Sequence, residues 1–248
     1  MAREQVLEGV ILRRWTSGEA DRVVSFLTPE RGKLRLRVRG TQKPNSRMGL
    51  LTEPLNRLSA RVIEGRHQRL LVQPHLLRTY LQVRTDLERL SAALALCETL
   101  DRWLAEEHAE PEAYFTLIQA LERLEQGGDV ATIVGWALWR WLAILGYAPD
   151  LSRCRECGHP ITGGDWQLDA GGCVCARCMP SRPNLTALSA EQVRTIHGWL
   201  LQAQPPQEPV VGAERLVRAA LGYAESVVDA EPRWLTFWER LNALRESG

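Results

Sequence analysis

The pattern of hydrophobic and polar positions changes near residue 80. Before that point, short apolar runs separated by clusters of Gly, Pro, Asn and Ser are typical of strands and turns. They predict strands at residues 6–13, 22–28, 33–39, 56–64 and 68–73. Residues 41–49 carry turn-forming side chains and are expected to lack regular structure. Five strands within about 75 residues favour a small β-barrel of the OB type over residues 1–80.

After residue 80, apolar positions recur with the 3.6-residue period of amphipathic helices. Thr85 and Glu88 have the spacing of a capping box, which predicts the start of a helix there. Further boundary signals predict helices that begin at Pro111, after Asp129 and after Ser189, and two more at about 213–229 and 232–246. The expected fold class is α+β, with an α-helical domain at 81–248 following the barrel.

Four of the six cysteines form two C-x-x-C pairs separated by 17 residues. Each pair can place two thiolates on one edge of a tetrahedron, which is the arrangement that a structural zinc ion requires. The sequence therefore predicts one structural Zn²⁺ in a module at about 150–182, held by Cys154, Cys157, Cys175 and Cys178. Cys173 breaks the paired spacing and is interpreted as a spare thiol.

Charge is divided unevenly along the chain, although the whole chain has a net charge of only +1. Residues 1–84 contain 17 Lys and Arg against 7 Asp and Glu, a net charge of +10, whereas the remainder contains 14 against 23, a net charge of −9. A basic domain joined to an acidic one is typical of a protein that binds a polyanion.

The third predicted strand alternates strictly between cations and apolar residues, so that its cations share one face. A phosphate backbone would relieve the repulsion between them. Together with the loop that follows, this strand gives the predicted DNA-binding residues Lys33, Arg35, Arg37, Arg39, Lys43 and Arg47. Few aromatic residues precede residue 80, so binding is expected to depend mainly on charge and on salt.

The catalytic motifs sought in the sequence are absent or incomplete. Leu34 and Leu27 occupy positions where a phosphate-binding loop needs Ser or Thr and its first Gly. His108 and Glu110 resemble the H-x-E of zinc deaminases, but Arg153 precedes the first C-x-x-C where proline is expected. The chain is therefore not expected to be an enzyme, and a zinc hydrolase or deaminase remains the less favoured alternative.

No apolar stretch approaches the roughly 18 residues of a membrane helix, and no apolar signal segment follows the N-terminus. The sequence therefore predicts a cytoplasmic protein without a membrane partner.

Several segments resemble the bacterial RecO recombination mediators of DNA repair. They are Glu8–Leu12, Glu19–Val24, Leu27–Gly32, Val38–Gly40 and Leu145–Leu151, the last running into Cys154. The resemblance spans nearly the whole chain. It implies an N-terminal OB domain, a helical domain and a zinc module. It also implies binding to single- and double-stranded DNA, annealing of complementary strands, and a nucleoid-associated location.

The partners that the resemblance implies are RecR and the single-stranded DNA-binding protein, with RecA loaded indirectly. A second interpretation is a zinc-ribbon regulatory factor, which would also be basic and independent of ATP. The two interpretations differ in whether binding prefers a defined sequence or RNA.

Overall fold

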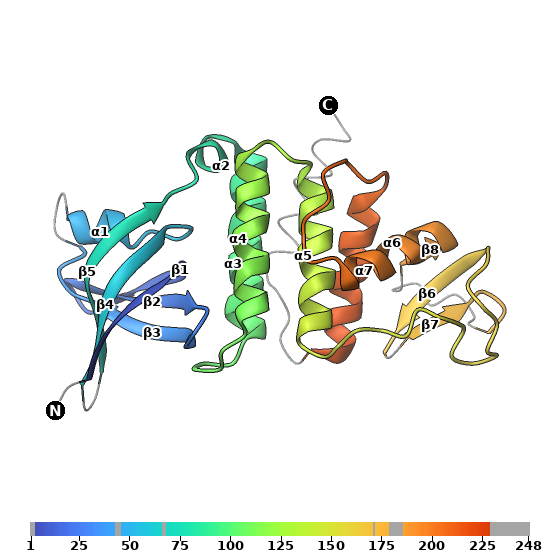
Figure 1. Cartoon of the computed structure of the whole chain (residues 1–248), viewed down its shortest axis with the longest axis horizontal. Coiled ribbons are helices and arrows are strands. Elements are labelled where there is room, and N and C mark those ends of the chain that lie inside the picture. The colour runs from blue at the N-terminus through green and yellow to red at the C-terminus, as the bar shows by residue number, and fades with distance from the viewer. Residues whose placement is uncertain (1–2, 43–45, 66–67, 171, 179–185, 229–248) are drawn as a thin grey trace. The chain divides into compact units, whose positions relative to one another are not determined.

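The computed structural model describes residues 3–42, 46–65, 68–170, 172–178 and 186–228. The chain forms two compact units, residues 1–115 and 116–248. The first unit contains a five-stranded barrel followed by helices, and the second contains further helices and a small sheet (Figure 1). This arrangement confirms the predicted α+β class.

The barrel closes in the strand order β1-β2-β3-β5-β4, in which the last two strands along the chain exchange places. Its strands are β1 Arg3–Ser17, β2 Asp21–Thr28, β3 Gly32–Val38, β4 Arg57–Glu64 and β5 Arg69–Arg78. All pairs are antiparallel except β3 with β5, which is parallel. This closed barrel confirms the expected OB-like domain.

Alternation along β3 determines which side chains enter the barrel core. Leu34, Leu36 and Val38 are fully buried and pack in one cluster with residues of the other strands, including Phe26 and Leu71. Because successive side chains of a strand point to opposite faces, the cationic residues of β3 are placed on the outside of the barrel.

The prediction that residues 41–49 lack regular structure is wrong for residues 47–49, because helix α1 spans Arg47–Leu51. Ser46 caps this helix by accepting a hydrogen bond from the Gly49 amide, and Thr52 closes it by donating to the Met48 carbonyl. A helix of five residues is too short to show a 3.6-residue period, and tertiary packing of its apolar residues stabilises it.

The helices that follow the barrel are α2 Leu81–Thr85, α3 Leu87–Trp103, α4 Pro111–Glu125, α5 Val130–Ile144, α6 Ala190–Leu201 and α7 Ala213–Val227. The predicted starts at Pro111, after Asp129 and after Ser189 are confirmed. The predicted cap at Thr85 is wrong, because Thr85 still belongs to α2 and Asp86 caps α3 by accepting from the Arg89 amide. The helix expected at 232–246 lies outside the described residues.

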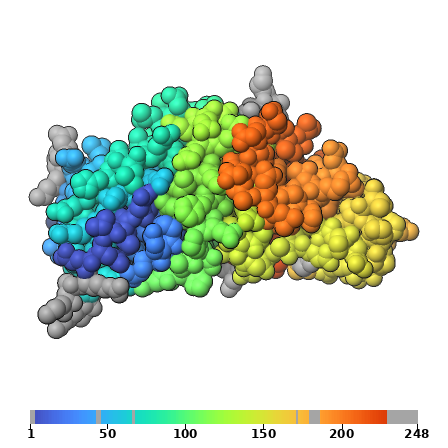
Figure 2. Space-filling model, viewed as in Figure 1, coloured from blue at the N-terminus to red at the C-terminus, as the bar shows by residue number. Residues whose placement is uncertain are grey.

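Helix α3 packs on β1, so the first compact unit extends beyond the barrel to Phe115. In the second unit, α5 packs against both α6 and α7, and the surfaces of these helices meet without a gap in Figure 2. Trp136 and Trp139 are fully buried there, and their indole N–H groups donate to the carbonyls of Gln202 and Leu216.

A small sheet with the order β7-β6-β8 carries the second cysteine pair. Its strands are β6 Asp165–Asp169, β7 Gly172–Cys175 and β8 Ala187–Ser189. The sequence did not predict these strands, because three to five residues are too few to establish an alternating pattern. The sheet supports the cysteines on regular backbone within the second unit.

Candidate nucleic-acid interface and metal centre

The outer surface of β1, β2 and β3 carries a short row of arginines beside one indole. In the strand register Ser25 opposes both Arg13 and Arg35, and Val23 opposes both Trp15 and Arg37. Side chains that oppose one another across neighbouring strands lie on the same face of a sheet. We call the set Trp15, Arg35, Arg37 and Arg39 the arginine face.

Lys33 departs from the expected solvent-facing row. Only 6% of the residue is exposed, and its ammonium group donates to the Asp101 carbonyl of α3 and lies 3.9 Å from Asp101 Oδ1. Burial lowers the pKa of Lys33, and the nearby Asp101 carboxylate opposes that shift. Lys33 therefore ties α3 to the barrel. The alternating pattern could not reveal this, because the covering residue lies 68 positions away.

Arg35 and Arg37 face outward, and each has an acidic neighbour. Arg35 Nε lies 2.5 Å from Glu106 Oε1, and its guanidinium is 5.8 Å from the centroid of the Trp15 ring. Arg37 Nε donates to Asp21 Oδ2 at 2.9 Å. The Gly40 amide and Arg37 lower the pKa of Asp21, despite a smaller opposing effect of burial. Asp21 thus joins the end of β3 to the turn that follows it.

Arg39 and Arg47 are exposed, and within the described part of the chain neither has an acidic group within ion-pair distance. Ser46 Oγ donates to the Gly40 carbonyl at 2.8 Å, which brings the turn containing Arg39 against the start of α1. Lys43, the remaining predicted DNA-binding residue, lies outside the described residues. Arg39 and Arg47 are therefore the predicted cations that the structure leaves available to an anion.

Acidic residues from beyond the barrel neutralise part of its charge. Over residues 1–115 the chain contains 19 Lys and Arg against 15 Asp and Glu, a net charge of +4 rather than the +10 counted over 1–84. Asp101, Glu106 and Glu107, which we call the acidic segment, contribute to this difference. Glu107 Oε2 accepts from Arg69 Nη2 at 2.7 Å, and this hydrogen bond lowers the pKa of Glu107.

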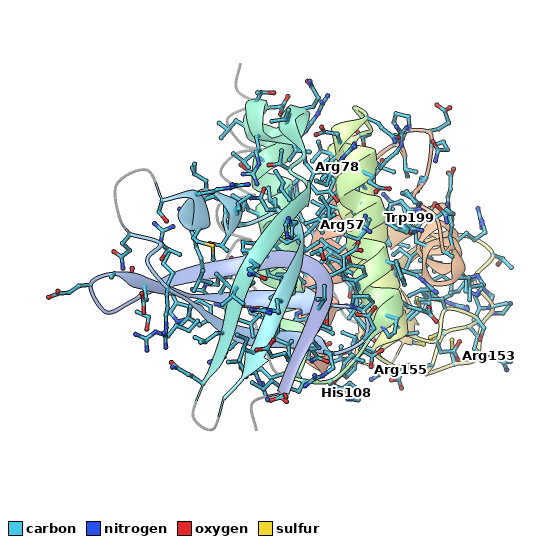
Figure 3. The ribbon with its side chains drawn as sticks, turned by 60° about the vertical axis from the view of Figure 1, so that its left-hand side comes forward. Arg57, Arg78, His108, Arg153, Arg155 and Trp199 are labelled. Carbon is cyan, nitrogen blue, oxygen red and sulfur yellow. The ribbon has the colours of Figure 1, made fainter. Side chains whose placement is uncertain are left out.

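Sequence reasoning did not single out Arg78, which is exposed at the end of β5. It opposes Arg57 of β4, as the labelled pair in Figure 3 shows, and its guanidinium lies 5.8 Å from the Tyr80 ring centroid. Arg57 Nε donates to Glu8 Oε1 at 2.8 Å, so its charge is balanced. No linear pattern marks Arg78, because only the register of β4 and β5 brings it beside Arg57.

The four predicted zinc ligands come together in the second unit. The sulfur atoms of Cys154, Cys157, Cys175 and Cys178 all lie within 4.8 Å of one another. Cys157 Sγ and Cys175 Sγ are 3.8 Å apart. A tetrahedral ion with Zn–S bonds of about 2.3 Å requires sulfurs about 3.8 Å apart, so this donor set fits zinc.

Local backbone turns direct each cysteine pair toward the cluster. The Gly158 amide donates to the Cys154 carbonyl at 2.8 Å, and Gly158 adopts a φ of +71° that favours glycine. The Cys178 amide donates to the Cys175 carbonyl at 2.9 Å. Arg153 and Arg155 belong to the first of these segments and are labelled in Figure 3.

The thiol environment favours metal binding at some of these positions and not at Cys173. Burial opposes ionisation of Cys154, but backbone N–H groups, the first from Cys175, outweigh it and lower its pKa. Burial, with smaller contributions from Asp150 and Cys154, raises the pKa of Cys173 to about 12. Cys173 is fully buried and is not part of the cluster, in agreement with its interpretation as a spare thiol.

The deaminase alternative receives no support from this geometry. Among the described residues, the cluster able to hold a metal ion contains four cysteines and no histidine. His108 is 70% exposed, and its Nε2 lies 3.2 Å from Glu110 Oε1. Four thiolates complete a tetrahedron and leave no position for a reacting water molecule.

Both parts of the chain match models of one protein family. The model of "Recombination protein O N terminal" matches residues 1–80, and that of "Recombination protein O C terminal" matches residues 84–203. The "DNA repair protein RecO" of Roseiflexus sp. is 30% identical over 241 residues, covering 93% of this chain and 83% of that protein. The protein of the same name from Thermobifida fusca is 33% identical over 177 residues, covering 70% and 73%.

None of the helices among the described residues combines the length and the apolar character that crossing a bilayer demands.

Proposed function

Because the chain belongs to the RecO family of DNA repair proteins, we propose that it is a non-enzymatic recombination mediator whose barrel binds DNA. It anneals complementary strands and helps to load RecA onto single strands that are coated by their binding protein. The observation that carries the proposal is the arginine face on a closed OB-like barrel, with Arg39 and Arg47 exposed and not engaged in an ion pair with any described residue.

The mechanism follows from the charge of this surface. Two complementary strands repel each other through their phosphates, and cations placed between them reduce that repulsion. Arg37 lies near the end of β3 and Arg39 lies in the turn that follows, and the Ser46 hydrogen bond holds the start of α1, with Arg47, beside that turn. The guanidinium group suits this role because it stays charged and offers two parallel donors to phosphate.

No nucleotide hydrolysis enters this mechanism. Leu27 and Leu34, which occupy the positions where a phosphate-binding loop needs Gly and Ser or Thr, are buried in the barrel. Annealing is therefore expected to proceed at the same rate with and without ATP.

The protein partners rest on family membership alone. The helical part of the chain is proposed to contact RecR and the single-stranded DNA-binding protein, and RecA is affected indirectly. A nucleoid-associated location in the cytoplasm would follow from DNA binding. A zinc-ribbon regulatory factor would instead show a preference for a defined sequence or for RNA.

One zinc ion held by Cys154, Cys157, Cys175 and Cys178 is proposed to have a structural role. When bound, it would neutralise the thiolates and join the two cysteine-bearing turns. The residues of this chain supply the backbone N–H groups that stabilise the thiolates and the sheet that supports Cys175.

The test compares Arg39→Ala/Arg47→Ala with a matched control, Arg194→Ala/Arg218→Ala, which removes two exposed arginines from α6 and α7. On single strands, each phosphate-binding cation contributes about 0.7 to the slope of log affinity against log salt. We expect the first variant to lose about 1.4 of this slope and to anneal strands more slowly. The control should match the wild type.

Annealing of complementary oligonucleotides is measured with and without ATP and magnesium. A folded Arg39→Ala/Arg47→Ala protein with unchanged salt slope and annealing rate would remove the barrel as the DNA site. A strict requirement for ATP would contradict the non-enzymatic mechanism.

A further inference from the structure

A groove of about 480 Å³ lies between α1 and β5, which run beside each other in Figure 1. It is formed entirely within the first unit. Its lining residues are Arg47, Met48 and Leu51 from α1, and Gln73, Pro74 and His75 from β5. This volume lies within the range typical of small-molecule sites.

The groove coincides with a distortion of β5. Val72 and His75 pair with β4 residues that are only two positions apart, so Gln73 and Pro74 together oppose the single residue Ala60. Such a bulge bends a strand and redirects its side chains, and bulges are frequent beside binding sites. Gln73 also has a φ of +49°, although it is not glycine and precedes a proline. Backbone conformations of this kind concentrate at ligand sites.

The lining of the groove combines apolar side chains with one cation and one aromatic ring. Met48 packs on the barrel core, and with Leu51 and the buried Pro74 it supplies apolar surface. Arg47 and His75 are exposed at the groove, where they add a cation and a flat aromatic ring. A ligand that fits this lining is flat and largely apolar on its faces, and it carries a negative charge nearby.

We propose that the groove receives one unstacked base of single-stranded DNA, while the adjoining phosphate contacts Arg47. The inference rests on the proposed DNA-binding function and adds a site that discriminates between DNA forms. The imidazole of His75 is the type of side chain on which unpaired bases stack. The amide of Gln73 can donate to and accept from the edge of such a base.

The charges nearby favour DNA over an apolar peptide as the occupant. Arg47 has no acidic partner among the described residues, and the turn containing Arg39 is held against α1 by the Ser46 hydrogen bond. A strand bound by Arg39 and Arg47 therefore passes the open side of the groove. Bases of a duplex remain stacked and cannot enter, so the groove should confer a preference for single strands.

The experiment uses the full chain and two fluorescently labelled probes of equal length, oligo-dT and the same backbone with abasic sites. Both probes carry the same phosphates, so a purely electrostatic surface binds them equally. We expect the wild type to bind oligo-dT roughly tenfold more tightly than the abasic probe, since the stacking of one base on an aromatic side chain contributes about 5- to 160-fold in affinity. The salt slopes of the two probes should be equal.

His75→Ala should abolish most of this difference, whereas the matched control His197→Ala, at an exposed position of α6, should retain it. Arg47→Ala should weaken binding of both probes alike. Thermal melting confirms that each variant is folded.

The outcomes separate the two proposals. Equal binding of both probes by the wild type, with a normal salt slope, would overturn the base-binding groove and leave the DNA-binding function intact. Discrimination that survives in His75→Ala would likewise overturn the groove. Binding of neither probe would instead contradict the proposed function.

Discussion

Replacing Glu106 and Glu107 by glutamine should strengthen DNA binding, because each carboxylate holds a barrel arginine that could otherwise contact phosphate. Glu106 pairs with Arg35, and Glu107 pairs with Arg69. The exposed fractions of these four side chains lie between 29% and 61%, so water and salt screen both pairs. A DNA strand must compete with these internal carboxylates before it can use the two arginines.

The magnitude follows from the exposure of the pairs. An exposed ion pair contributes about 0.2–1 kcal/mol, so the two pairs together weaken the free energy of DNA binding by about 0.4–2 kcal/mol. Their removal should tighten binding roughly 2- to 30-fold. Arg69 keeps a second ion pair, with Glu64 at 3.6 Å, so the freed Arg35 alone should steepen the salt slope on single strands by about 0.7, and by about 1.4 if Arg69 also contacts phosphate. The stability of the protein should fall by no more than the same small energy.

Fluorescence anisotropy with labelled oligo-dT at several salt concentrations measures both quantities. The matched control is Glu19→Gln/Glu30→Gln, which makes the same change of net charge at two exposed acids. Neither of them forms an ion pair with a described residue. A general effect of charge would appear equally in both variants. Equal affinities and equal slopes for the two variants would refute the argument that the acidic segment masks specific arginines.

Two further outcomes follow from the placement of single residues. Lys33→Ala should lower the free energy of unfolding by about 1–3 kcal/mol, because it removes a buried donor to Asp101, and should leave the salt slope of DNA binding unchanged. Chemical denaturation measures the first effect and fluorescence anisotropy the second. A variant of unchanged stability with a flattened salt slope would show that Lys33 contacts DNA. Cys157→Ser should bind no zinc and melt at a lower temperature, whereas Cys173→Ser should bind one zinc ion per chain, as the wild type is expected to do. Metal analysis and thermal melting measure these effects, and the reverse result would reassign the ligands.

The elements that could be predicted from the sequence depend on neighbouring residues. Asp129 caps α5, and Ser189 with Gln192 forms a capping box at the start of α6, because a cap needs only residues within one turn. Leu34, Leu36 and Val38 are buried in the barrel as the two-residue period required. These features are local, so the order of residues already contains them.

The cysteine cluster could also be predicted, although 17 residues separate its two pairs. Each C-x-x-C pair forms its own turn, and a tetrahedral set of sulfurs needs only two such turns to approach each other. The short strands around Cys175 were missed, because their pairing is established by other segments of the second unit.

Tertiary structure alone decided which cations are available. Lys33 and Arg35 follow the same alternating pattern, yet Lys33 is buried and donates to the Asp101 carbonyl, whereas Arg35 is exposed and pairs with Glu106. The groove beside Gln73 likewise arises from the bulge in β5 and from the packing of α1 against that strand. A linear pattern records which face of an element a residue occupies. What covers that face depends on residues tens of positions away, and only packing brings them there.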